Sequence, residues 1–308
     1  MDYVKFISLK LVRIILSCLD GKKMRKIDLH LHTTASDGSD TPSELIAKAK
    51  DAGISVISVT DHDTIAGCLE AVKLADDGIK VVTGIEFSCH HYGECDFDCH
   101  ILGYGFDPES EALLSAIGHG REMRLYKLEA RLVYLKDTFG IEFTDEEKAW
   151  LRSLNSVARP HIARLLIKHG LAADVDEAFE KYLRGGKFPD DRIDAREATE
   201  AILAAGGIPV YAHPLGGERE KRLSSDEVRE RVGALSRMGL MGLECFYSRY
   251  SHSDSELLLS LAKRYGLLSS AGSDYHGKNK TVVLGSLSSD GCAPRLDEIT
   301  VLEPLIGK

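Results

Sequence analysis

The chain lacks an excess of positive charge. Its 308 residues contain 39 lysine and arginine residues against 48 aspartate and glutamate residues, so the formal net charge at pH 7 is −9. A protein that binds duplex DNA needs many basic side chains that face the phosphates. The acidic balance therefore argues against duplex DNA as a partner. It is compatible with a small anionic substrate that is held by metal ions.

The sequence lacks both a dense set of cysteines and a long uninterrupted apolar run. Seven cysteines are too few, and odd in number, for the disulfide framework of a small secreted domain. We therefore expect a reducing compartment, the cytoplasm. The apolar run at 4–19 is interrupted by Lys10 and Arg13, so it is too short and too charged to span a bilayer, and no membrane contact is expected. Residues 1–23 are expected to be a dispensable leader that need not be ordered, with a surface amphipathic helix as the alternative.

Seven short apolar segments have the pattern of buried strands, and helical patterns separate many of them. The segments are 26–32, 54–60, 79–87, 100–106, 208–214, 241–246 and 267–274. Strands that alternate with helices indicate an α/β fold with a mostly parallel sheet. The fourth segment begins with His100, whereas the other segments carry such residues near their ends. This position predicts that the fourth strand runs opposite to its neighbours.

The strand pattern disappears between residues 107 and 193. Helical patterns fill this part of the chain, at 109–138, 144–153, 160–169 and 174–184. We expect one α/β domain built from 24–106 and 194–308, with 107–193 as a helical insertion. An insertion of this size within a series of βα units usually forms a cap over the open face.

Residues that bind metals stand at the carboxyl end of nearly every predicted strand. His30 and His32 share one face of the first strand, because side chains alternate with a period of two. An isolated pair of this kind could also be two hydrogen-bonded histidines at a sheet edge. Asp37 comes after the first strand, and similar residues lie at or just beyond the ends of the other strands, except for His100, which opens the fourth: Asp61, His62, Asp63, Glu86, His100, His213, Glu244, Asp274 and His276. Because α/β folds assemble active sites at the carboxyl ends of strands, we predict one metal centre.

The ligand types indicate two or three divalent metal ions. Imidazole and carboxylate ligands suit Mn²⁺, Zn²⁺ or Fe²⁺, and Mg²⁺ is also acceptable. The number of candidate ligands exceeds what one ion can use. Metal binding lowers the pKa of a water molecule from about 15.7 toward about 7, so a metal-bridging hydroxide could attack phosphorus. A serine or cysteine nucleophile is then not needed. The sequence has neither a nucleophile elbow nor a P-loop.

A cysteine-rich segment at 88–100 has two interpretations. A separate structural zinc site could use its thiols and imidazoles, namely Cys89, His90, His91, Cys95 and Cys99. No pair of these cysteines has the CxxC spacing that is typical of such sites. We therefore favour a hairpin with incidental thiols.

The segment NSVARPHIARLL, at 155–166, predicts a phosphate-binding helix start. Pro160 suits the first turn of a helix, which places Arg159 and His161 where backbone N–H groups favour an anion. A guanidinium can hold a phosphate through two hydrogen bonds. The alternative is an ordinary helix start with a solvated arginine.

Taken in order, these motifs resemble the PHP (polymerase and histidinol phosphatase) superfamily. The matching segments are DLHLHT at 28–33, SDG at 36–38, TDHDT at 60–64, GIEFS at 84–88, HILGYG at 100–105, AHP at 212–214 and GSDYHG at 272–277. The resemblance implies a distorted (β/α)7 TIM-like barrel with a trinuclear metal centre. The implied ligands are His30, His32, Asp37, His62, Glu86, His100, His213, Asp274 and His276. Asp61 and Asp63 are then expected to orient imidazoles.

The helical insertion and the lack of a polymerase region resemble the stand-alone bacterial members of the family, which act on nucleoside 3′,5′-bisphosphates or trim short RNA. This resemblance implies a metal-dependent phosphoric ester hydrolase that acts on a small phosphorylated substrate, a nucleotide. Asp37, His62 and His276 are its expected catalytic residues, and Arg159 and His161 bind the substrate phosphate. The alternatives are a 5′–3′ exonuclease on short RNA or single-stranded DNA, a histidinol-phosphate phosphatase, and a non-enzymatic metal or nucleotide sensor.

Overall fold

A computed structural model describes residues 26–93, 95–190, 192–218 and 220–306. The expected leader at 1–23 lies outside these residues. None of the helices in the described part of the chain is both long and apolar enough to cross a bilayer.

The described strands form two sheets. The first sheet is parallel and contains β1 (Lys26–Leu31), β2 (Ile54–Val59) and β3 (Lys80–Val82), in that order. The second sheet has the order β6 (Ile193–Asp194), β4 (Gly84–His91), β5 (Phe97–Tyr104), β7 (Ile208–Tyr211), β8 (Gly242–Tyr247) and β9 (Leu268–Gly272). Only β5 runs antiparallel to both of its neighbours in the described sheets. This confirms the prediction for the strand that contains His100.

The two sheets meet at two seams. At one seam the backbone N–H of Asp274 donates to the carbonyl of His30 at 2.9 Å, and Leu31 forms a bridge with Tyr275. At the other seam His62 forms a bridge with Glu86. Continuous strand pairing around a ring is not found among the described residues. The α/β fold is therefore confirmed, whereas a closed barrel is not.

The expected strand at 79–87 is divided between the two sheets, and this prediction was wrong. Strand β3 pairs with β2, and β4 pairs with β5 and β6 in the other sheet. Gly84 lies at the change of sheet, where a Cβ atom would be 2.1 Å from Ser58 Oγ and 2.7 Å from the carbonyl oxygen of Val59. Only glycine permits this close approach. The apolar pattern continues through the change of sheet because both strands are buried.

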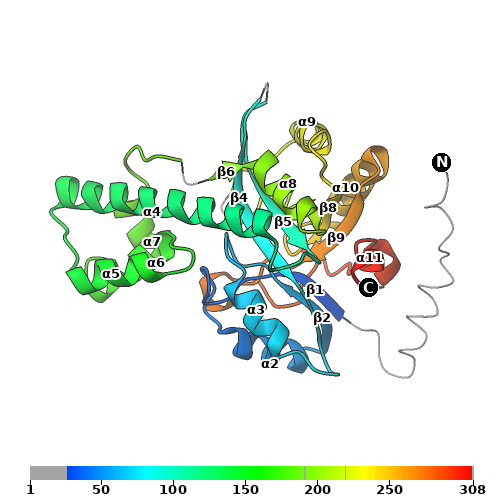
Figure 1. Cartoon of the computed structure of the whole chain (residues 1–308), viewed down its shortest axis with the longest axis horizontal. Coiled ribbons are helices and arrows are strands. Elements are labelled where there is room, and N and C mark those ends of the chain that lie inside the picture. Colours follow the sequence, from blue (N-terminus) through cyan, green and yellow to red (C-terminus); the bar gives the residue numbers. More distant parts are fainter. Residues whose placement is uncertain (1–25, 94, 191, 219, 307–308) are drawn as a thin grey trace.

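Helices cover the outer faces of the two sheets (Figure 1). They are α2 (Pro42–Asp51), α3 (Ala66–Lys73), α8 (Ala195–Ala204), α9 (Ser225–Ser236), α10 (His252–Tyr265) and α11 (Leu302–Ile306). One hydrophobic core joins them to the strands and includes Leu29, Ile57, Phe87 and Leu243, all without exposed surface. The start of α2 has the expected capping box, in which Thr41 and Glu44 bond each other's backbone N–H groups.

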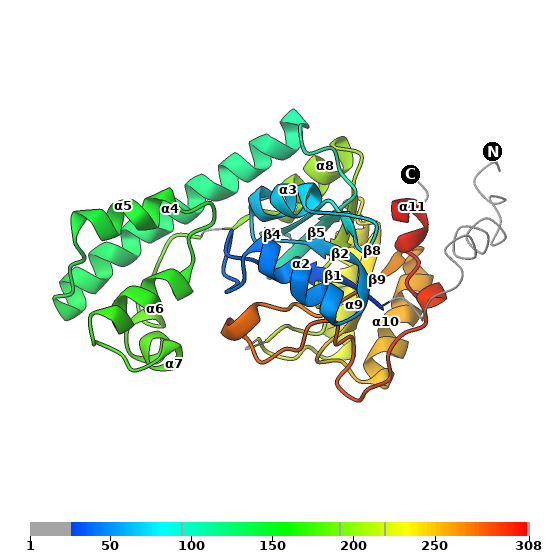
Figure 2. The same cartoon turned by 90° about the horizontal axis from the view of Figure 1, so that it is seen from below.

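The remaining helices form an arm that projects from the sheets (Figures 1 and 2). This helical arm consists of α4 (Glu111–Phe139), α5 (Asp145–Ser153), α6 (Arg159–Lys168), α7 (Val175–Ala178) and the π-helix η1 (Phe179–Leu183). The helices lie within one or two residues of the predicted ranges. A second hydrophobic cluster holds them together and includes Leu128, Leu151, Ile162 and Leu166. The arm therefore has a small core of its own.

Candidate metal centre and substrate pocket

The fold brings all nine predicted metal ligands together. They come from the carboxyl ends of β1, β2, β7 and β9, from the interior of β4, and from β5, which approaches from the opposite direction. The residues are His30, His32, Asp37, His62, Glu86, His100, His213, Asp274 and His276. Six different strands or the loops after them thus supply side chains to one place.

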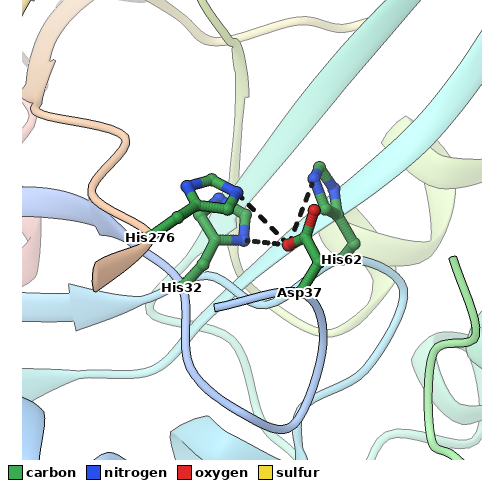
Figure 3. A group of neighbouring side chains, drawn as sticks. All are labelled: His32, Asp37, His62 and His276. Atoms are coloured by element: carbon green, nitrogen blue, oxygen red, sulfur yellow. Dashed lines mark ion pairs between the residues drawn. The ribbon is translucent and has the colours of Figure 1, made fainter. Parts of the chain in front are cut away.

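One group surrounds the carboxylate of Asp37 (Figure 3). Its Oδ1 atom lies 3.2 Å from Nε2 of His276, 3.8 Å from Nδ1 of His32 and 4.0 Å from Nε2 of His62. The four side chains come from three loops that are far apart in the sequence. They point toward one another, so each can offer one ligand atom to the same ion.

Glu86 lies between two pairs of imidazoles. Its Oε2 atom lies 3.1 Å from Nε2 of His32 and 3.1 Å from Nδ1 of His62. Its Oε1 atom lies 2.9 Å from Nδ1 of His100 and 3.3 Å from Nε2 of His213. A single carboxylate thus faces imidazoles on two sides, an arrangement that suits a bridging ligand.

Asp274 presents its two oxygen atoms to different partners. Oδ1 lies 3.6 Å from Nε2 of His30 and 3.4 Å from Nε2 of His32. Oδ2 accepts hydrogen bonds from the Tyr247 hydroxyl at 2.9 Å and from Nζ of Lys280 at 2.7 Å. Only Oδ1 is therefore directed at the imidazoles.

Several buried polar atoms in this cluster have no hydrogen-bond partner. They are Nε2 of His30, both ring nitrogens of His32, Nδ1 of His62, Oε2 of Glu86 and Nε2 of His276. Buried polar atoms are normally hydrogen-bonded, because an unsatisfied group destabilises the fold. Here the unsatisfied atoms face one another at distances of a few ångströms. Nitrogen and oxygen lone pairs that converge in this way fit divalent cations.

The pKa shifts of Asp37 and His62 have the signs that metal ligands need. Burial raises the pKa of Asp37, but the imidazoles of His276 and His62 outweigh it and hold that pKa well below its usual range. Burial holds the pKa of His62 well below its usual range, although Glu86 and Asp37 oppose this effect. Metal binding requires ionised carboxylates and neutral imidazoles. Asp37 and His62 are therefore already in their ligating forms at neutral pH.

Nearby carboxylates raise the pKa values of two other imidazoles. Burial disfavours the charged form of His32, but the nearby carboxylates of Asp274 and Glu86 raise its pKa to about 9. Burial also opposes the charge on His213, whereas Glu220 and Glu86 raise its pKa to about 10. Bound cations would supply the positive charge that protons otherwise bring.

Glu244 orients two of the candidate ligands. Its Oε1 atom lies 3.0 Å from Nδ1 of His30, and its Oε2 atom accepts the backbone N–H of His213 at 2.7 Å. A carboxylate on one ring nitrogen directs the other nitrogen toward a metal. The sequence pattern placed Glu244 at a strand end, but it did not distinguish a ligand from this orienting role.

The expectation that Asp61 and Asp63 orient imidazoles was wrong. Asp61 accepts hydrogen bonds from Thr33 and from Ser36 Oγ, so it fixes the loop between His32 and Asp37. Asp63 accepts the backbone N–H of Ser88 at 2.9 Å and Nε of Arg124 at 2.7 Å. Both carboxylates hold backbone segments and the arm instead of histidine rings.

Three non-glycine residues at the centre have left-handed backbone conformations. They are Asp63 with φ of 51°, His213 with φ of 29° and Asp274 with φ of 60°. No other described residue except glycine has a positive φ. Such conformations are unfavourable for residues with a Cβ atom and concentrate at functional sites.

A cavity of about 320 Å³ connects the metal centre with the helical arm. Asp37, His62, Glu86 and Asp274 line its inner end. Its walls are rich in basic side chains: Arg124, Lys127, Arg131, Arg159, Arg192 and Lys280. Positive charge in a concave site attracts anions. The wall of the cavity can therefore attract an anion although the net charge of the whole chain is negative.

The two predicted phosphate-binding residues have different positions. Arg159 is the first residue of α6 and lines the cavity, where its guanidinium lies 4.9 Å from the ring centre of Phe179. His161 is buried, and its Nδ1 atom accepts the backbone N–H of Ala158 at 3.0 Å. It therefore caps the helix and is not among the residues that line the cavity.

The cysteine-rich segment forms a hairpin, as expected. Strands β4 and β5 pair in register, with Cys89 opposite Cys99. Cys95 lies in the turn region and is partly exposed. None of the groups of described residues that could hold a metal contains a cysteine, so the alternative of a structural zinc site finds no support.

The sequence matches the PHP domain model over residues 28–205. A 5′-3′ exoribonuclease of Haemophilus influenzae is 34% identical, and the alignment covers 82% of this chain and 90% of that protein. A 3′,5′-nucleoside bisphosphate phosphatase of Chromobacterium violaceum is 32% identical, with coverage of 82% and 88%. A phosphoribosyl 1,2-cyclic phosphate 1,2-diphosphodiesterase of Eggerthella lenta is 33% identical, with coverage of 82% and 94%.

Solved structures show the same similarity. A protein of Bifidobacterium adolescentis, assigned by inference as a metal-dependent phosphoesterase, superposes with a TM-score of 0.74 and 29% identity, covering 94% of this chain and 100% of that one. A protein of Chromobacterium violaceum, described as an amidohydrolase with bound sulfate, gives a TM-score of 0.71 and 30% identity, covering 83% and 89%. The likeness thus extends over most of the length of each chain.

Proposed function

The chain belongs to the PHP domain family and is a phosphoester hydrolase, and from this premise we propose that it cleaves a phosphomonoester of a nucleotide such as a nucleoside 3′,5′-bisphosphate. The observation that carries the proposal is the arrangement of the cavity. Imidazoles and carboxylates with unsatisfied atoms lie at its inner end, and basic side chains lie along its walls. A substrate with a reactive phosphate and a second anionic group fits both regions.

The candidate ligands would hold two or three divalent cations. When bound, such ions polarise phosphoryl oxygens and lower the pKa of a coordinated water molecule. Asp37, His62 and Glu86 line the cavity as well as facing the cluster, so they lie where the reacting phosphate would enter. The side chain of Glu86 is 1% exposed, and low-dielectric surroundings strengthen charge interactions at this point.

Arg159 is our candidate for binding a second phosphate of the substrate. The guanidinium stands at the amino terminus of α6 and is packed against Phe179. Stacking on a ring limits its freedom, so less conformational entropy is lost when a phosphate binds. His161 supports this position indirectly, because its hydrogen bond to Ala158 fixes the first turn of the helix.

A panel of substrates tests the proposal. The purified protein should release inorganic phosphate from a nucleoside 3′,5′-bisphosphate faster than from the matching monophosphate. Chelation should abolish the activity, and Mn²⁺ should restore it. Arg159→Ala should leave the metal content unchanged and raise KM for the bisphosphate, by roughly tenfold or more if one charged hydrogen bond is lost. Equal KM values for the wild type and the variant would refute the phosphate clamp.

A second candidate function is 5′–3′ trimming of short RNA. Lys127 and Arg131 line the cavity from α4, and residues four positions apart share one face of a helix. Four residues of helix span about 6 Å, so together with Arg159 on α6 they offer basic groups to more than one phosphate. A chain of several phosphates could follow this row. Release of mononucleotides from a short 5′-phosphorylated oligoribonucleotide would favour this function, and an intact oligonucleotide would exclude it.

A further inference from the structure

A lysine stands directly beside the metal centre. Nζ of Lys280 donates to Oδ2 of Asp274 at 2.7 Å, and the lysine side chain is 22% exposed. It follows η2 (Gly277–Asn279), in the orange segment that faces α6 and α7 (Figure 2). The other lysines and arginines of the described cavity wall belong to residues 124–192. Among the lysines and arginines of the described cavity wall, Lys280 is the one that belongs to the segment after β9.

Asp274 does not depend on the lysine for its orientation. The Tyr247 hydroxyl donates to the same Oδ2 atom at 2.9 Å. The backbone N–H of Asp274 is held by the carbonyl of His30 at 2.9 Å. One of these contacts holds the carboxylate and the other holds the backbone that carries it. The ammonium of Lys280 is therefore not the sole support of Asp274, and it can also act on a ligand in the cavity.

The ammonium has donors to spare. A lysine carries three N–H donors. The contacts within the described residues use one of them, on Asp274 Oδ2. The group lies against a cavity whose inner end also contains Asp37 and Asp274. The remaining donors can therefore reach an anion that lies over the centre.

The position of Lys280 is fixed by the segment that carries it. The side-chain amide of Asn279 donates to the carbonyl of Asp37 at 2.7 Å, and the backbone N–H of Lys278 donates to Ser39 Oγ at 2.8 Å. These bonds tie η2 to the loop that also carries a candidate ligand. A charge that is held in place before the substrate arrives stabilises a transition state more than a mobile one does.

We propose that Lys280 is a catalytic residue that donates a charged hydrogen bond to a non-bridging oxygen of the phosphoryl group undergoing hydrolysis. This inference rests on the proposed function and extends it. The proposal gives different tasks to two basic groups of the cavity. Arg159 on the arm binds the remote phosphate, whereas Lys280 beside Asp274 acts on the reacting one. Positioned cations of this kind are the main protein contribution to phosphoryl transfer.

The test compares Lys280→Met, Lys280→Arg and the control Lys278→Met. Lys278 lies in the same turn but is not part of the cavity wall, so its replacement removes an equal charge from the same segment. Each protein is purified with its bound metal, and its metal content is measured by mass spectrometry. Calorimetry with inorganic phosphate gives a dissociation constant without turnover. Hydrolysis of the bisphosphate gives kcat and KM.

We expect Lys280→Met to retain its metal, to bind phosphate at least about tenfold more weakly, and to lose a similar factor in kcat. Lys280→Arg should recover part of both losses, and Lys278→Met should match the wild type. An unchanged phosphate affinity in Lys280→Met would overturn the proposal. Loss of metal in that variant would overturn it too, because the lysine would then serve only to support Asp274. Phosphate binding is measured without turnover. A wild-type protein that binds phosphate but hydrolyses no ester would therefore contradict the proposed function, and it would not contradict the contact between Lys280 and phosphate.

Discussion

Arg124 and Asp63 form a buried ion pair that joins the helical arm to the rim of the metal centre. The Nε atom of Arg124, on α4, donates to Oδ2 of Asp63 at 2.7 Å, and the two side chains are 8% and 2% exposed. The same guanidinium donates to Ser88 Oγ at 2.8 Å and to the carbonyl of Val157 at 3.4 Å. One side chain thus contacts the loop after β2, strand β4 and the segment before α6. Any displacement of the arm would be transmitted to the strand that carries Glu86.

Arg124→Met should destabilise the protein strongly. The variant leaves the carboxylate of Asp63 buried without its partner, which lowers the free energy of unfolding by about 3–5 kcal/mol. Urea unfolding measures this change. The double variant with Asp63→Asn should recover part of the loss, because the uncompensated charge is gone. Arg121→Met, an exposed change one turn earlier, should stay within about 0.5 kcal/mol of the wild type. An equally mild effect of Arg124→Met would show that the pair does not hold the arm.

His30→Ala should remove metal and activity together. The ring nitrogen Nε2 faces both Glu86 and Asp274, so its loss takes a ligand from the middle of the cluster. We expect at least one ion fewer per chain by elemental analysis and phosphatase activity near the detection limit. His252→Ala, which changes an exposed imidazole on α10, is the matched control. A His30→Ala protein with full metal content would contradict the ligand assignment.

Glu244→Ala should weaken metal binding without removing a ligand. The change takes away the carboxylate that fixes Nδ1 of His30 and that accepts the backbone N–H of His213. Loss of such an orienting group typically costs about 10–100-fold in metal affinity. Competition with a chelator measures the dissociation constant. Glu256→Ala, on the exposed side of α10, should have no effect. If both variants bind metal like the wild type, the orientation of His30 must come from elsewhere.

Acid should weaken the helical arm through Glu147. Hydrogen bonds from Lys168 and His169 lower the pKa of this carboxyl to about 2, from an ordinary value of 4.5. Because the folded pKa is lower than the unfolded one, the contribution to stability is complete above about pH 4.5 and is lost as the pH falls toward about 2. Trp150 is the only tryptophan of the chain and lies on α5 in the same arm, so its fluorescence reports on arm unfolding.

The measurement is urea unfolding followed by Trp150 fluorescence at about pH 6 and about pH 3. Glu147→Gln should be less stable than the wild type at the higher pH and should lose less stability on acidification. Asp137→Asn removes an exposed carboxylate from α4 and should follow the wild-type pH dependence. Parallel curves for the wild type and Glu147→Gln would exclude this carboxyl as the origin of the acid effect.

The sequence predicted the cluster of candidate metal ligands because its signal is local. His30, His32 and Asp274 each stand at or near the end of a buried strand, and parallel strands bring such ends together. The change of sheet at Gly84 was not visible, since both neighbouring segments are apolar and no turn residues separate them. The closed barrel was inferred from resemblance, and the strand pairing of the described residues does not contain it.

Contacts between distant parts of the chain account for the other differences. Arg124 and Asp63 are separated by 61 residues, and the helical pattern of α4 does not indicate which of its arginines is buried. A carboxylate after a strand can bind a metal or support a ligand, so the pattern could not assign Glu244 or Asp61. His161 has the residue type of a phosphate-binding group, yet its ring is used within its own helix turn.

The seam between β1 and β9 has a consequence for biosynthesis. Asp274 pairs with His30, so the two partners are 274 − 30 = 244 residues apart. At about 5–20 residues per second, roughly 10–50 s pass on the ribosome between the emergence of the first strand and that of its partner. During this interval β1 has an open edge, and its histidines lack Asp274 and His276. The full set of candidate ligands therefore exists only after the chain has been made as far as His276, and until then the open edge of β1 can pair with other chains.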